Sequence, residues 1–306
     1  MTTLLALGGQ MPLGAVTLGL FEQLLVSGVV VGSTYALIAV SFGIIYSTTR
    51  VFHFAHSIVY AVTAYVAVIA VDNLGLPLLP AAALGLVAAV VFGLLIEFVF
   101  YRPMRNAGAT LLGIFLVSLG ITIAGPNLLQ IIFGPVNKPL PGFNVHTHAQ
   151  GSVTYTNLDI LRVVLAWVLI GALILFLERT KYGRAVTAVR TNREMAAAVG
   201  ISPERIYLLT FGIGSLLVGV ASLLFTVNGV ASPQMGLQPV LTGFIAVFLG
   251  GIGSTSGAAL GGLVLGLASN LSGLWLSSDF SPAVVFGVLF VLLIVRPQGL
   301  LGKLAV

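Results

Sequence analysis

Residues 78–101 read LLPAAALGLVAAVVFGLLIEFVFY, and Glu97 is the single charged residue in this run. The hydrocarbon core of a bilayer is about 30 Å thick, so a helix needs roughly 20 apolar residues to cross it. The run therefore predicts a transmembrane helix. Similar runs recur along the chain, in which apolar residues make up 58% and charged residues only 7%, whereas ordinary soluble domains carry about 25% charged residues. The sequence predicts an all-α, polytopic membrane protein without a separate soluble domain.

The hydropathy pattern predicts about eight or nine transmembrane helices. The expected spans are residues 24–46, 54–71, 78–101, 109–133, 160–177, 206–227, 240–249, 258–274 and 282–295. One of them, 240–249, would be only about 15 Å long as a helix, and the glycine-rich segment GGIGSTSG follows it at residues 250–257. We therefore expect a discontinuous or re-entrant pair of helices near residues 240–275, whose exposed backbone must face protein or water.

The distribution of basic residues predicts the orientation. If the segment 178–205 is cytoplasmic, eleven of the 13 Lys and Arg residues lie inside and only Lys138 and Arg162 lie outside, which is the bias known for membrane proteins. The inner residues outside that segment are Arg50, Arg102, Arg105, Arg296 and Lys303. The amino terminus is then outside and the carboxyl terminus cytoplasmic. Basic residues beside membrane spans do not indicate nucleic-acid binding, and the chain has no cysteine for disulfide or thiolate chemistry.

The segment 178–205 itself contains six of the Lys and Arg residues and the signal of a short helix. Thr191 and Glu194 have the spacing of a capping box, and Gly200 suits the left-handed residue that ends a helix. About seven residues lie between these caps, too few for a helix that is stable alone in water. An apolar face at helical spacing is formed by Met195, Ala198 and Val199. Two interpretations fit: a basic cytoplasmic loop of the kind every polytopic protein has, or a docking element for a soluble partner.

Several blocks of sequence resemble the permease subunits of branched-chain amino acid ABC importers. Within the basic segment they are residues 178–185 (ERTKYGRA), 192–196 (NREMA) and 200–201 (GI). Elsewhere they are residues 32–39 (GSTYALIA), 54–56 (FAH), 101–105 (YRPMR), 249–254 (LGGIGS) and 296–300 (RPQGL). The blocks occur in the same order as in that family and cover the chain from about residue 24 onward.

The resemblance implies one transmembrane permease domain over residues 1–306, with a cytoplasmic coupling loop at 178–205, in a multi-pass protein of the bacterial inner membrane. It implies as partners a second, homologous permease, two cytoplasmic ATP-binding subunits and an extracytoplasmic solute-binding protein that delivers a small-molecule substrate. ATP and Mg would bind the ATPase partners, with no cofactor, metal or catalytic residue on this chain. The residues expected to couple the permease to the ATPase are Thr191, Arg193, Glu194, Met195, Ala197, Ala198, Gly200 and Ile201.

A translocation pathway is expected where the short helix leaves backbone groups unpaired, since lipid cannot accept them. The residues expected to line it are Ser57, Tyr60, Thr63, Gly250, Gly251, Gly253 and Ser254. The alternative is that these glycines only allow close packing of helices. The second predicted span departs from the family pattern, which commonly reads NFAHGE, because residues 53–58 read HFAHSI here. Ile58 replaces the acidic residue, so the substrate could be an amide, urea or short organic acid instead. His53 and His56 lack a nearby carboxylate to complete a metal site, and packing is expected for both.

An ion-coupled secondary transporter is the competing class. Such proteins rely on ionisable groups inside the membrane, and Glu97 is the only acidic residue well inside a predicted span. The segment 299–304, GLLGKL, lacks the spacing of a phosphate-binding loop and the Ser or Thr that follows its lysine. The chain is therefore expected not to hydrolyse ATP itself.

Overall fold

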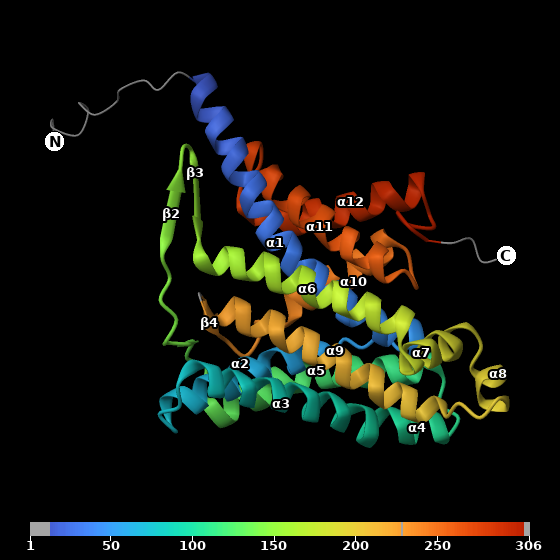
Figure 1. Ribbon diagram of the computed structural model, residues 1–306. Coiled ribbons are helices and arrows are strands. Elements are labelled where there is room, and N and C mark those ends of the chain that lie inside the picture. Colours follow the sequence, from blue (N-terminus) through green and yellow to red (C-terminus); the bar gives the residue numbers. More distant parts are fainter. Residues whose placement is uncertain (1–12, 228, 303–306) are drawn as a thin grey trace, which may run out of the picture.

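Nine apolar helices form the computed structural model of the protein, which describes residues 13–227 and 229–302 (Figure 1). The long helices are α1 (Leu13–Thr49), α3 (Leu78–Ile96), α5 (Leu111–Phe133), α6 (Asn157–Arg179), α9 (Pro203–Thr226) and α11 (Thr255–Leu271). The shorter ones are α2 (His56–Asp72), α10 (Leu237–Gly250) and α12 (Ser281–Val295). A π-helical turn, Glu97–Tyr101, and α4 (Arg102–Asn106) extend α3. The predicted all-α, polytopic class is confirmed.

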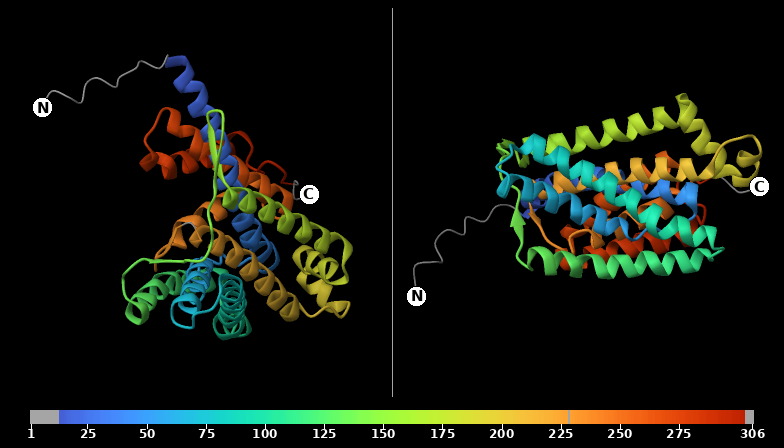
Figure 2. Two further views of the ribbon diagram at one scale, coloured as in Figure 1. Left: turned by 60° about the vertical axis from the view of Figure 1, so that its left-hand side comes forward. Right: turned by 90° about the horizontal axis from the view of Figure 1, so that it is seen from below.

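The bundle has two different ends. At one end, α7 (Lys181–Thr191) and α8 (Arg193–Ala198) lie beside the α10–α11 turn; we call this the loop end. At the other end, β2 (Thr147–Gln150) pairs antiparallel with β3 (Val153–Thr156), and we call this the hairpin end. A second short pair joins β1 (Lys138–Pro139) to β4 (Val230–Ala231). Most helices run between the two ends, with the hairpin and the loop on opposite sides (Figure 2). Lys303 and the first twelve residues, including the predicted outer amino terminus, lie outside the described residues.

Glycine lets α1 and α11 touch backbone to backbone. A β-carbon added to Gly266 would overlap the Cα atom of Gly32, and one added to Gly262 would overlap the backbone of Ala36. Near the hairpin end, a β-carbon on Gly28 would lie 3.1 Å from the Cα atom of Leu267. Helices in lipid gain little from burying apolar surface against each other, so close packing of small residues is a main source of their association. This contact sets α11 directly against α1 along much of its length.

The glycine-rich turn after α10 lies at the loop end. Gly251 and Gly253 have φ values of +101° and +87°, which favour glycine. Ser254 then caps α11 by accepting a hydrogen bond from the Gly257 N–H. The carboxyl-terminal segment covers the turn, because the N–H of Leu300 donates to the Leu249 carbonyl at 2.8 Å. The turn therefore joins two packed helices beside α7, and it does not interrupt a span at its middle.

The break that shortens α10 lies before it. The helix begins at Leu237, three residues earlier than the sequence predicted, and has 14 residues. Gly236 lies so close to Ser57 that an added β-carbon would overlap the Ser57 carbonyl. α2 also begins inside the bundle, since the Ala55 N–H donates to Ser118 of α5 at 3.0 Å. Two non-helical segments, 50–55 and 229–236, thus enter the bundle, and the helices that follow them start side by side.

We predict that Gly266→Ala destabilises the protein, because the new methyl group must push α1 and α11 apart. Overpacking of this kind costs about 1–3 kcal/mol. Thermal unfolding of the detergent-solubilised protein, followed by size-exclusion fluorescence, measures the effect. Gly171→Ala in α6 is the matched control, because no atom lies within 4 Å of its added β-carbon. A Gly266→Ala protein as stable as the Gly171→Ala protein would show that the α1–α11 contact is not rigid.

Candidate functional site

The loop end is built on α7, which packs on the start of α9. Thr180 caps α7 by accepting a hydrogen bond from the Gly183 N–H at 2.9 Å. Val186 and Val189 are buried and form a small apolar cluster with Ile206 and Tyr207 of α9. Burial of this face holds α7 against the bundle, so the next helix, α8, projects from a fixed base (Figure 1).

The cap of α8 differs from the sequence prediction. Asn192 is the N-cap, and its Oδ1 atom accepts the Met195 N–H at 2.9 Å. Thr191 remains the last residue of α7, where its hydroxyl donates to the Thr187 carbonyl. The predicted Thr191–Glu194 capping box is therefore wrong. Asn192 is the N-cap because its extended backbone, with φ −152°, separates α7 from α8 and leaves its side chain free to accept the capping hydrogen bond.

The apolar face of α8 is exposed. Met195 is 64% exposed and Val199 is 70% exposed, and Ala197 and Ala198 are also exposed. Only Ala196, among the residues of α8, is buried against the protein. Gly200 ends the helix with φ +87°, as predicted. A helix of six residues that presents large apolar side chains to solvent is suited to docking against another protein.

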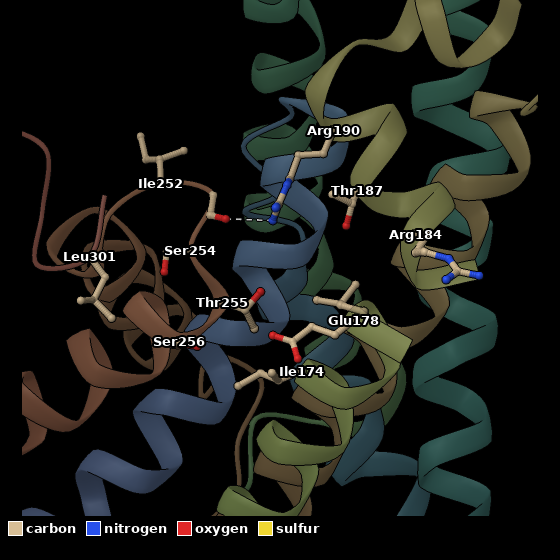
Figure 3. Close-up of a pocket in the computed structure, with 12 residues that line it drawn as sticks. Ile174, Glu178, Arg184, Thr187, Arg190, Ile252, Ser254, Thr255, Ser256 and Leu301 are labelled. Atoms are coloured by element: carbon tan, nitrogen blue, oxygen red, sulfur yellow. Dashed lines mark hydrogen bonds between the residues drawn. The ribbon is translucent and has the colours of Figure 1, made fainter. Parts of the chain in front are cut away.

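A pocket of about 620 Å³ lies between α7 and the α10–α11 turn. Arg190 of α7 reaches over it and donates from Nη1 to the Gly253 carbonyl at 2.8 Å (Figure 3). Burial, and then the positive charge of Arg50, lower the pKa of Arg190. Arg184 points away from the turn, whereas Glu178 points into the pocket. The remaining lining residues are Ile174, Leu177, Thr187, Ile252, Ser254, Thr255, Ser256 and Leu301.

Charged and aromatic side chains connect α8 to the interior. Arg193 forms an ion pair with Glu204 at 3.6 Å and lies over the Tyr207 ring at 5.6 Å. Arg105 lies over the same ring at 4.7 Å and forms a salt bridge with buried Glu97. The Tyr207 ring thus contacts one guanidinium from α8 and one from α4.

The contacts continue from the π-helical turn to the centre of the bundle. The Tyr101 hydroxyl lies 2.9 Å from His53 Nδ1. The His53 and His56 rings are 5.1 Å apart, and His56 Nε2 lies 3.0 Å from the hydroxyl of Ser41 in α1. The described residues contain no group of three His, Cys, Asp or Glu side chains that could hold a metal ion. The histidines therefore act here as buried hydrogen-bonding groups between α1 and the α3 extension.

The residues predicted to line a pathway fall in two places. Gly250, Gly251, Gly253 and Ser254 belong to the turn at the loop end, beside Arg190. Ser57, Tyr60 and Thr63 are buried in α2. Of these three, Tyr60 lines a second cavity of about 240 Å³ together with Arg162 of α6. Sequence reasoning treated Arg162 only as an outer charge; its position as the third residue of the predicted span 160–177 was the signal that could have singled it out.

The family of this chain is shown by a family model and by curated relatives. The family described as "Branched-chain amino acid transport system / permease component" matches residues 24–295. The high-affinity branched-chain amino acid transport system permease proteins BraD of Pseudomonas aeruginosa and LivH of Escherichia coli K12 are each 34% identical over 297 residues, covering 92% of this chain and 96% of theirs. The solved structure of PsaBC from Streptococcus pneumoniae in complex with Fab shares the fold, with a TM-score of 0.51, 14% identity, and coverage of 90% of this chain and 92% of that one.

We predict that Tyr207→Leu loosens α8, because it removes the ring between Arg105 and Arg193. Each cation–π contact contributes about 0.5–2 kcal/mol, so exchange of amide hydrogens over residues 193–201 should accelerate by roughly 2- to 30-fold. Hydrogen exchange with mass spectrometry measures this directly. Tyr207→Phe keeps the ring and should leave the rate unchanged. Equal rates in both variants would show that the ring does not restrain the loop.

Proposed function

Because the chain belongs to the branched-chain amino acid transport system permease family, we propose that it is the membrane-spanning permease subunit of an ATP-driven amino-acid importer. The exposed apolar face of α8 is the observation that carries this proposal. A chain that moves solute without its own ATPase site needs a surface through which ATP hydrolysis on another subunit can act. The complete importer would contain a second permease of the same family, two ATP-binding subunits that hold ATP and Mg, and an extracytoplasmic solute-binding protein.

Charge supports a cytoplasmic loop end in a bacterial inner membrane. The six basic residues of 178–205 lie there, and so do Arg50, Arg102, Arg105 and Arg296 at the ends of α1, α4 and α12. Lys138 follows α5 and Arg162 lies near the start of α6, both toward the hairpin end. Basic residues accumulate on the cytoplasmic side of membrane proteins. The hairpin β2–β3 would then face the solute-binding protein.

The residues that we propose for coupling lie in or beside α8, and each has a distinct structural role. Asn192 caps α8, Arg193 ties it to α9 and Glu194 stays exposed. Met195, Ala197 and Ala198 offer the apolar surface, and Gly200 turns the chain back. Ile201 joins the buried cluster beneath α7. A short, capped helix with an exposed apolar face and a fixed base can transmit the movement of a docked ATPase to α9 and α4.

The family supports branched-chain amino acids as the substrate class. The change from an acidic residue to Ile58 has a structural explanation, since Ile58 is buried against Gly125 of α5, where an added β-carbon would lie 2.6 Å from the isoleucine Cγ1 atom. Amides, urea or short organic acids remain the alternative substrates within the same permease function. A secondary transporter is disfavoured, because Glu97, the only fully buried carboxylate among the described residues, is neutralised by Arg105.

The orientation gives a direct prediction. In this cysteine-free chain, a cysteine at Thr191 should react with an impermeant thiol reagent only after the cell is opened, whereas one at Thr147 should react in intact cells. Both positions are exposed, so accessibility in the protein itself does not differ. Labelling of Thr191→Cys from outside the cell would contradict a cytoplasmic loop end.

The coupling role predicts that Ala197→Asp separates ATP hydrolysis from transport. A charge on the apolar face of α8 should weaken docking by about 2 kcal/mol or more if the contact is an interface hot spot. The measurement combines co-purification of the ATP-binding subunits with uptake of labelled leucine by vesicles that contain the complete complex. Gly200→Pro should act similarly, because it removes the N–H that donates to the Ala197 carbonyl.

Ala107→Asp is the matched control for the coupling experiment. Ala107 is also exposed at the loop end, where it follows α4, and the substitution adds the same charge. It should leave docking and uptake at wild-type values. Normal docking and uptake in Ala197→Asp would exclude α8 as the coupling element, and a wild-type complex that takes up no branched-chain amino acid would contradict the proposed substrate class.

A further inference from the structure

The second cavity lies between five elements in the half of the bundle nearer the hairpin end. α1, α2, α6 and α9 line it, together with the start of α10. Arg162 and the hydroxyl-bearing residues Thr34, Tyr35 and Tyr60 form its polar part. The apolar part is formed by Val30, Val31, Ile38, Phe225 and Pro239. A cavity so divided can hold a solute that has one charged and one aliphatic part.

Arg162 has hydrogen-bonding capacity left for a ligand. Its Nε and Nη2 atoms donate to the Leu224 carbonyl at 3.1 and 2.9 Å, and Nη1 donates to Asp159 at 3.3 Å. A guanidinium carries five N–H groups, so these bonds leave one on Nη1 and one on Nη2. The two terminal nitrogens of arginine match the two oxygens of a carboxylate.

Asp159 engages Arg162 through only one of its two oxygens. Its Oδ2 atom accepts two hydrogen bonds from Thr156, one from the backbone N–H and one from the hydroxyl, to cap α6. Only Oδ1 faces Arg162, at 3.3 Å. The Leu224 carbonyl, near the end of α9, is an uncharged acceptor, so its hydrogen bonds with Arg162 do not neutralise the guanidinium. A basic group held inside a membrane helix is costly, and such residues commonly serve solute pathways.

The size of the cavity suits a small solute. At about 240 Å³ it falls just below the roughly 300–1,000 Å³ of sites for drug-sized ligands. Tyr60, which is 1% exposed, closes one side, and its hydroxyl makes only a long contact of 3.5 Å to the Ala221 carbonyl. This hydroxyl can turn to a ligand at little cost, because the contact it would give up is weak.

We propose that this cavity binds the carboxylate of a small aliphatic amino acid through Arg162, with the aliphatic part against Val30, Ile38 and Phe225. The inference rests on the proposed function and adds a site on this chain through which the solute passes. Binding is weak, because a transport site must release what it admits. Discrimination depends on the carboxylate more than on the amino group, since no acidic side chain is among the described residues that line the cavity.

The test uses the purified importer complex with a single cysteine, Thr34→Cys, inside the cavity. The rate of modification by a small, water-soluble thiol reagent is measured alone and with millimolar L-leucine, leucinamide or 4-methylpentanoate. Leucine and 4-methylpentanoate should slow the reaction several-fold, and leucinamide, which lacks the carboxylate, should not. Arg162→Gln, whose amide can still donate to the Leu224 carbonyl, should abolish the protection. A cysteine at Ala107, which is exposed after α4 at the loop end, is the control and should react equally in every condition.

Two results would overturn the site. Equal protection by leucine and leucinamide would exclude recognition of the carboxylate, and no protection by any solute would exclude binding in the cavity. Neither comparison requires the Arg162 variant to fold. Leucine uptake by the same unmodified complex is measured in parallel. Leucine uptake without protection would contradict the site but not the proposed function. Carboxylate-dependent protection without uptake of any branched-chain amino acid would contradict the proposed substrate class but not the site.

Discussion

The backbone contact between α1 and α11 is the constraint on which the other features depend. Gly32, Gly262 and Gly266 bring the two helices closer than any larger side chain would allow, and in lipid such small-residue contacts replace the hydrophobic effect as the source of association. Because α11 follows α1 closely, the α10–α11 turn arrives beside the end of α1 and next to α7. Arg190 can then bridge α7 and the turn through a single hydrogen bond. The position of the surface that we propose for the ATPase therefore depends on the α1–α11 contact, which lies elsewhere in the bundle.

Contacts between side chains connect this surface to the interior. Tyr207 lies between Arg193 of α8 and Arg105 of α4, and Arg105 is fixed by Glu97 in the π-helical turn. The same turn places Tyr101 against His53, beside the point where α2 begins. Single π-helical turns inside α-helices are frequently found at functional sites. Side-chain contacts thus connect α8 to α9 and α4, and from there to the segment that precedes α2.

The sequence predicted the helices well, because a bilayer-spanning helix needs a long apolar run and little else. It placed the start of α10 three residues too late, and in the structure that start coincides with the close contact of Gly236 with Ser57. The cap of α8 was assigned to Thr191 because Thr191 and Glu194 fit a known spacing, yet Asn192 competes for the same role and its backbone is the extended one. The β2–β3 hairpin lies in a polar stretch, and its alternation of apolar and polar residues is too short to predict strands. Arg162 was noted only for its charge, since its neighbours Leu224 and Tyr60 are distant in sequence.

The charges inside the bundle are arranged in two pairs with a neutral region between them. Glu97 and Arg105 lie toward the loop end, and Asp159 and Arg162 lie toward the hairpin end. The polar groups between them are hydroxyls and the imidazoles of the two buried histidines, and no carboxylate, lysine or arginine is buried there among the described residues. An isolated ion would lose its hydration in that region without gaining a partner, whereas a zwitterionic solute can leave its carboxylate near Arg162 while its aliphatic part enters first. For the pathway that we propose, a neutral centre therefore disfavours the passage of a simple ion, which would have to give up its hydration there.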